Sequence, residues 1–118
     1  IVGKVGEEFK DGTSTYIFTP EHFKKSLERS LKRLKTDYLD VLLIHSDGTD
    51  VEILSQDALM ETMMDFKKSG LVRAIGASTK TTEGGTMTLE RMDCAMVAYN
   101  PGYVTERPVL DRALELNK

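Results

Sequence analysis

Four polar positions of this sequence end or directly follow an apolar run and carry side chains that could do chemistry. They are Lys4, His45, the pair Ser78-Thr79 and the pair Tyr99-Asn100. An imidazole can donate a hydrogen bond into a pocket or act as a general acid. A lysine ammonium can lower the pKa of a neighbouring acid or hold an anion, and hydroxyls can hold an amide or a phosphate. The first three positions also have a structural alternative, namely an exposed lysine, a hydrogen-bonded histidine inside the fold, and hydroxyls that cap a turn.

The apolar runs themselves predict four strands of a buried sheet, over residues 1–5, 38–45, 71–77 and 94–99. Residues 38–45 are almost continuously apolar, which is typical of a parallel strand that is covered on both faces. Small polar residues and glycines predict loops over residues 6–15 and 46–50. The polar residues 78–88 predict a further loop that contains a short helix.

Three longer helices are predicted between and after these strands. The first begins at Thr19-Pro20-Glu21, which combines a capping hydroxyl, a proline suited to the first helical position and an acid at the positive end of the helix dipole. Its apolar stripe has helical spacing and consists of Phe23, Leu27, Leu31 and Leu34. The second helix begins around Ser55 and ends at Gly70, which suits a left-handed cap. The third covers residues 105–117 and buries Val109, Leu110, Ala113 and Leu114.

Strands that alternate with helices in this way predict an α/β fold with a parallel sheet. Two architectures fit the pattern, an open doubly wound sheet or an arc of a TIM (β/α)8 barrel. A whole barrel needs roughly 200 residues or more, so 118 residues supply about half of one. Ligands bind beyond the carboxyl ends of the strands in both architectures, so the four polar positions are predicted to converge on one rim.

Composition excludes several other classes of protein. The net charge of −3, from 19 acids and 16 bases without long blocks, argues against nucleic-acid binding. No uncharged apolar run approaches the roughly 20 residues that cross a membrane, and no signal-peptide pattern opens the chain. The single cysteine, Cys94, suits a reducing compartment, so a cytoplasmic location is expected. It is predicted to pack as a small hydrophobe, and His22 is predicted to be solvated surface. No metal-ligand cluster, dinucleotide fingerprint or P-loop is present.

Three segments, taken in order, resemble the aldo-keto reductase superfamily. They are residues 26–40, which run into Leu43-Ile44-His45, residues 70–78, and residues 98–101 after one further strand. The resemblance covers essentially the whole chain and corresponds to about the third to sixth βα units of that family's barrel. It therefore implies that residues 1–118 are a partial barrel domain, a half barrel of about four parallel strands that lacks the first and last barrel units.

The family reduces aldehydes and ketones by hydride transfer from NADPH, with a catalytic tetrad of Asp, Tyr, Lys and His. By resemblance, His45 matches the tetrad histidine that hydrogen-bonds the substrate carbonyl. Lys4 matches the tetrad lysine, which lowers the pKa of the proton-donating tyrosine. Ser78 and Thr79 match a Ser-Asn pair that binds the nicotinamide carboxamide, and Met96 stands where the family has a glutamine for the same amide.

The departures from the family pattern set limits on this expectation. Thr79 and Met96 replace an asparagine and a glutamine, and none of the four tyrosines stands at the tetrad position. The resemblance thus implies half a tetrad, and the isolated chain is expected to be inactive. The alternative is a non-catalytic scaffold or regulatory subunit, in which two half barrels form a homodimer through exposed strand edges. A third option is a barrel aldolase that uses Lys4 as a Schiff base.

Overall fold

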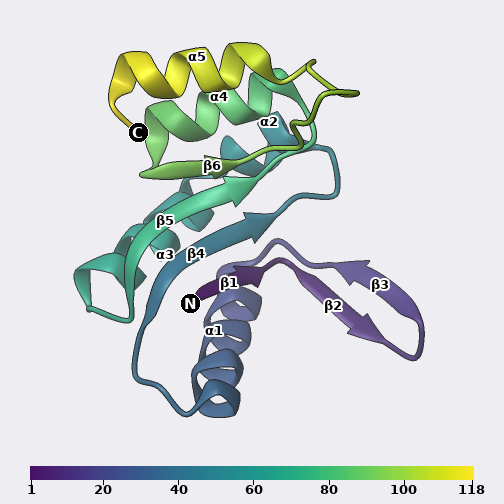
Figure 1. Cartoon of the computed structure of the whole chain (residues 1–118). Coiled ribbons are helices and arrows are strands. Elements are labelled where there is room, and N and C mark those ends of the chain that lie inside the picture. The colour runs from purple at the N-terminus through teal and green to yellow at the C-terminus, as the bar shows by residue number, and fades with distance from the viewer.

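Four parallel strands form the main sheet in the computed structural model, which describes residues 1–118 (Figure 1). They are β1 (Val2–Val5), β4 (Leu39–His45), β5 (Val72–Ser78) and β6 (Cys94–Met96). The strands lie side by side in chain order, and each neighbouring pair is parallel. An open doubly wound sheet reverses its strand order, whereas a barrel does not. The observed order therefore favours the barrel arc, a choice that hydrophobic periodicity alone leaves open.

The helices cover one face of this sheet. They are α1 (Pro20–Leu34), α2 (Asp50–Leu54), α3 (Asp57–Lys68), α4 (Thr82–Arg91) and α5 (Arg107–Leu116). The core forms where buried strand side chains such as Leu42, Ile44 and Ile75 meet buried side chains of α1 and α3 such as Phe23 and Met63. Because side chains alternate along a strand, the residues between these point to the opposite face, which is here called the open face. No helix of the chain is both long enough and apolar enough to span a bilayer.

The predicted start of the first main helix and the predicted end of the second are confirmed. The Thr19 hydroxyl accepts a hydrogen bond from the backbone N–H of His22 at 3.2 Å, which caps α1. Gly70 follows α3 with a φ of +80°, the left-handed conformation that favours glycine. The apolar stripe of α1 is not buried along its whole length, since 48% of Leu34 is exposed. Leu34 is the last residue of α1, where the helix gives way to the connection to β4.

Residues 6–15 are not a loop, because most of them form an antiparallel hairpin of β2 (Glu7–Lys10) and β3 (Thr13–Tyr16). Its two turn residues, Asp11 and Gly12, have φ values of 51° and 80°. Positive φ at both central positions is the geometry of a type I′ turn, for which Asp-Gly is a common signal. Figure 1 shows the hairpin extending beyond the end of β1 and away from the main sheet. The strands were missed because both are polar and show no alternation of apolar and polar residues.

The hairpin also overturns the prediction for His22. Its side chain is only 10% exposed, and its Nε2 lies 3.7 Å from the Glu8 carboxylate of β2. A helix pattern considered alone places this histidine in solvent. The hairpin, which the pattern does not contain, covers the first turn of α1.

The last strand and the last helix differ from their predicted forms. β6 ends at Met96 and not at Tyr99, because its neighbour β5 ends at Ser78 and offers no further backbone to pair with. Leu114 is 80% exposed, so its predicted burial is wrong. α5 packs on α4 through Val109, which is the one fully buried residue of this helix.

The helix α4 is longer than the short helix predicted, and two adjacent glycines allow close packing on both sides of it. A Cβ on Gly84 would lie 2.2 Å from the Cβ of Asp50 on α2, and a Cβ on Gly85 would lie 2.7 Å from Val109 Cγ2 on α5. Both separations are far below van der Waals contact. The Gly-Gly pair is therefore a packing feature of the helix layer.

Candidate active site

Three of the predicted site residues form a single row at the carboxyl end of the sheet. His45 pairs with Ser78 across β4 and β5, and Ser78 pairs with Met96 across β5 and β6. Side chains of paired residues in neighbouring strands point to the same face. His45, Ser78 and Met96, here called the rim row, therefore all lie on the open face.

Lys4 lies on the same face, one layer below this row. It pairs with Leu43, which stands two residues before His45 on β4. Two residues of strand correspond to roughly 7 Å along the strand direction. The Lys4 side chain is exposed and makes no hydrogen bond or ion pair within the chain. It can therefore supply an uncompensated positive charge next to the rim row.

The His45 imidazole is held from the hairpin by two residues that sequence reasoning missed. Its Nδ1 lies 2.6 Å from the Oε2 atom of Glu7, and the Tyr16 ring meets it edge-on with 6.0 Å between ring centroids. Both contacts were missed because the hairpin was predicted as a loop. The Asp-Gly turn was the one signal that could have revealed it. The His45 Nε2 makes no hydrogen bond to the protein, so it remains available to a ligand.

Glu7 is anionic in this arrangement. A hydrogen bond from the Ser14 side chain lowers the pKa of Glu7 most, partial burial opposes this effect, and the His45 imidazole lowers the pKa further. The Glu7 side chain is 23% exposed and that of His45 is 28% exposed. The carboxylate and the imidazole thus form a half-buried pair at the edge of the open face.

The next residue of the hairpin, Glu8, points the opposite way and fastens the hairpin to α1. It accepts hydrogen bonds from both terminal nitrogens of Arg29, one of them at 3.0 Å. These bonds hold the pKa of Glu8 below its ordinary value against partial burial, with a further contribution from the Arg29 charge. Adjacent residues of a strand face opposite sides, so one glutamate reaches the site while the other anchors the strand that carries it.

The structure separates the two adjacent residues that the resemblance assigns to the nicotinamide amide. Ser78 is half-buried on the open face, and its hydroxyl makes no hydrogen bond, so it has a donor and an acceptor free for an amide. Thr79 is 8% exposed, and its hydroxyl is buried without a partner, 3.4 Å from where a Cβ on Gly85 would lie. The Thr79 hydroxyl therefore faces α4. Its backbone N–H donates to the carbonyl of Met96 at 3.1 Å, which joins the two strand ends.

The loop that follows Ser78 and Thr79 is fixed by one buried carboxylate. Oδ2 of Asp50 accepts hydrogen bonds from the N–H of Lys80 at 3.0 Å, the N–H of Thr81 at 2.7 Å and the hydroxyl of Thr81 at 2.5 Å. Asp50 is 2% exposed. It lies in α2, a helix that the sequence pattern did not predict, and so its role was also missed.

Tyr99 and Asn100, the fourth predicted position, are not brought to the rim row. They lie in the loop after β6, where Asn100 pairs with Tyr103 through two backbone hydrogen bonds. The early end of β6 explains this outcome.

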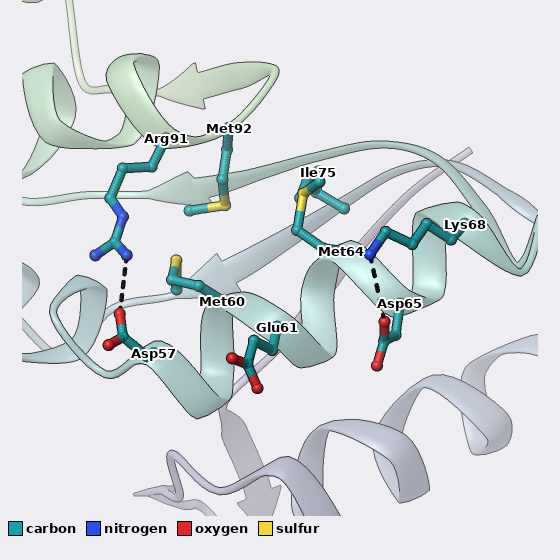
Figure 2. A pocket seen from close by; sticks show the side chains of 9 residues that line it. All are labelled: Asp57, Met60, Glu61, Met64, Asp65, Lys68, Ile75, Arg91 and Met92. Atoms are coloured by element: carbon teal, nitrogen blue, oxygen red, sulfur yellow. Dashed lines mark hydrogen bonds and ion pairs between the residues drawn. The ribbon is translucent and has the colours of Figure 1, made fainter.

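A groove of about 390 Å³ lies between α3 and α4, on the side of the sheet opposite the open face (Figure 2). Methionine side chains and Ile75 line it, and all of its charged groups except Glu61 form ion pairs with one another. Arg91 lies 3.1 Å from Asp57, and Lys68 lies 4.0 Å from Asp65. None of the predicted site residues lines this groove, and it offers no convergent set of free polar groups. We therefore place the candidate site on the open face.

Comparisons with known proteins agree with this architecture. Residues 1–109 match the model of the aldo/keto reductase family. Methylglyoxal reductase DkgB of Salmonella typhi is 35% identical over 94 residues, which are 75% of this chain and 34% of that protein. A putative aldo-keto reductase from Pseudomonas aeruginosa has a solved structure that is 48% identical with a TM-score of 0.95, and the match covers 99% of this chain and 46% of that one.

A second solved structure, the holo form of the aldo-keto reductase AKR11C1 from Bacillus halodurans, is 27% identical with a TM-score of 0.70. The match covers 84% of this chain and 34% of that one. The chain thus spans between a third and a half of the lengths of these relatives. The sheet and its helices match part of an aldo-keto reductase barrel, which confirms the predicted half-barrel arc.

Proposed function

Because this chain belongs to the aldo/keto reductase family, we propose that the protein reduces the carbonyl group of a small aldehyde or ketone with NADPH. When bound, NADPH would supply a hydride to the carbonyl carbon and leave as NADP⁺. A proton delivered to the carbonyl oxygen would complete the alcohol. The relative named as a methylglyoxal reductase supports a small carbonyl compound as the substrate class.

The single observation that carries this proposal is the arrangement of Lys4 and His45 on one face of the sheet. The free Nε2 of His45 is placed to donate a hydrogen bond to a carbonyl oxygen when both ring nitrogens carry a proton, and so to orient the substrate. The unpaired ammonium of Lys4, one layer below, stabilises negative charge on a proton-donating phenol beside it. The resemblance places the tetrad aspartate and tyrosine before the lysine strand, so we propose that residues outside these 118 supply both.

The residues proposed to bind the cofactor lie on or beside the same open face. We propose that the Ser78 hydroxyl binds the nicotinamide carboxamide, since it is unpaired and lies in the rim row. Met96, also in the rim row and 40% exposed, lines the same site. For Thr79 we propose a positioning role, because its hydroxyl faces α4 and its N–H binds the end of β6.

Substitution of the two candidate catalytic residues tests this function in the full-length protein that contains this sequence. His45→Ala and Lys4→Met are each expected to lower kcat for carbonyl-dependent NADPH oxidation by about 100-fold or more, the range typical of lost acid–base groups. Lys10→Met is the matched control, because Lys10 is an exposed lysine of the hairpin that lies outside the site. Near-normal turnover in both site variants would contradict the assignment.

One observation favours a second candidate, a non-catalytic half barrel that self-associates. The open face leaves Val2 exposed by 54%, and β1 and β6 have no neighbour on their outer edges. In the reductase, further strands of a barrel cover this face, whereas in the alternative a second copy covers it. Native mass spectrometry distinguishes the two: a complex of two 13.2 kDa chains without reductase activity supports the alternative.

A further inference from the structure

We propose that the β2–β3 hairpin fixes the orientation of the His45 imidazole, with Glu7 as the positioning residue. This inference rests on the proposed function, in which His45 orients the substrate carbonyl. It goes further by assigning a role in the reaction to a segment outside the barrel strands.

The contacts on His45 come from both strands of the hairpin at one point. Glu7 and Tyr16 are register partners at its base. Opposed residues of an antiparallel pair point to the same face, so both side chains reach the same neighbour. Glu7 holds Nδ1 at 2.6 Å, and the Tyr16 ring lies at 69° to the imidazole plane. The hydrogen bond at Nδ1 and the Tyr16 ring beside the imidazole together restrict both rotation and tilt of the imidazole.

The hydrogen bond to Glu7 also determines which nitrogen can serve the substrate. An anionic carboxylate can only accept a hydrogen bond, so Nδ1 carries a proton and donates it to Glu7. Nε2 is then the nitrogen that remains for a ligand, and in the doubly protonated ring its N–H can donate to a carbonyl oxygen. Without Glu7 the ring is free to rotate and to exchange its tautomer.

The base of the hairpin is fixed against the end of β4, which makes it a firm support for these contacts. The N–H of Ile17 donates to the carbonyl of Gly6 at 2.8 Å and closes the base. Gly6 has a φ of +106°, and a Cβ there would lie 2.9 Å from the Phe18 ring and 3.3 Å from the carbonyl oxygen of His45. Only a residue without a side chain fits this approach. On the other face of β2, the Glu8–Arg29 pair ties the hairpin to α1.

Glu7→Ala and Glu8→Ala form a matched pair that separates positioning from anchoring. They are adjacent glutamates of the same strand. Glu7 pairs with His45, whereas Glu8 pairs with Arg29 and lies near His22. In the full-length protein we expect Glu7→Ala to lower kcat by about 10- to 100-fold, the range known for loss of the hydrogen-bond partner of a metal-binding histidine. The KM for NADPH is expected to change less than twofold. Glu8→Ala removes an anchor of the hairpin but leaves the Glu7–His45 contact and the backbone bond at the hairpin base, so it is expected to lower kcat less than Glu7→Ala does. Glu7→Gln retains a hydrogen-bond acceptor in a side chain of the same shape, so its kcat is expected to fall less than that of Glu7→Ala.

A second readout does not depend on catalysis. Long-range ¹H–¹⁵N NMR spectra of the imidazole, assigned with His45→Gln, report which ring nitrogen carries a proton. In the wild type we expect a protonated Nδ1, and in Glu7→Ala we expect averaged tautomers, with Glu8→Ala unchanged. Unchanged His45 nitrogen shifts in Glu7→Ala, or a kcat equal to that of Glu8→Ala, would overturn the proposal. Absence of reductase activity in the wild type with the predicted shift change would instead reject the proposed function and retain the positioning role.

Discussion

Replacing Asp50 with alanine tests whether one buried carboxylate holds the loop that carries the cofactor side of the site. Oδ2 of Asp50 accepts from the two backbone N–H groups of Lys80 and Thr81 and from the Thr81 hydroxyl. Asp50 itself is 2% exposed, so water has little access to replace it. Alanine at this position leaves both backbone donors without an acceptor.

The expected loss of stability follows from these orphaned donors. A buried donor left unsatisfied costs about 1–3 kcal/mol, and two of them cost about 2–6 kcal/mol. The Thr81 hydroxyl is omitted from this sum because it can rotate to another partner. Asp50→Asn keeps an acceptor oxygen, so its free energy of unfolding is expected to fall less than that of Asp50→Ala.

Asp47→Ala is the matched control for this substitution. Asp47 lies three residues earlier and also accepts two hydrogen bonds, from the N–H of Thr49 at 2.9 Å and from its hydroxyl at 2.7 Å. It is exposed, so water takes its place, and the expected change is about 0.5 kcal/mol. Urea unfolding of the full-length protein measures the free energy of unfolding of each variant. A loss in Asp50→Ala no larger than that in Asp47→Ala would refute the reasoning.

Two further predictions concern β5 and the hairpin. A Cβ on Gly76 would lie 2.1 Å from the backbone oxygen of Cys94, so Gly76→Ala is expected to destabilise the protein by about 1–3 kcal/mol. Calorimetry should show a lower Tm than for Gly102→Ala, where the space is ordinary, and equal Tm values would count against this contact. The lowered pKa values of Glu7 and Glu8 imply that their contribution to stability is complete above the ordinary glutamate range, near pH 4.3. This contribution is lost as the pH falls through the lower pKa values of the folded state. On acidification, hydrogen exchange should therefore show residues 7–16 opening before the main sheet. Simultaneous opening of the two would contradict this prediction.

The main sheet could be predicted from the sequence because its long strands appear as continuous apolar runs along the chain. Residues 38–45 and 71–77 are apolar runs, and α1 carries a start signal and an apolar stripe. The hairpin could not be predicted from periodicity, because its strands are polar on both faces. The length of β6 depends on where its neighbour β5 ends, which is a tertiary property.

The candidate site likewise contains residues that the sequence could predict and residues that it could not. Lys4, His45 and Ser78 could be proposed from their place at strand ends, because parallel strands bring those ends together. Glu7 could not, since its contact with His45 joins two positions far apart in the sequence. The different surroundings of Ser78 and Thr79 could be expected from the sequence, because adjacent residues at the end of a strand face opposite sides.

The most direct test of the central claim follows the hydride itself. The full-length protein is incubated with a panel of small aldehydes and ketones and with NADPH that carries deuterium at both hydrogens of C4. Mass spectrometry of the products is predicted to show an alcohol with one deuterium on the former carbonyl carbon, and this product should decrease strongly in His45→Ala. Failure of the wild type to reduce any carbonyl of the panel, or an alcohol that contains no deuterium, would contradict the account.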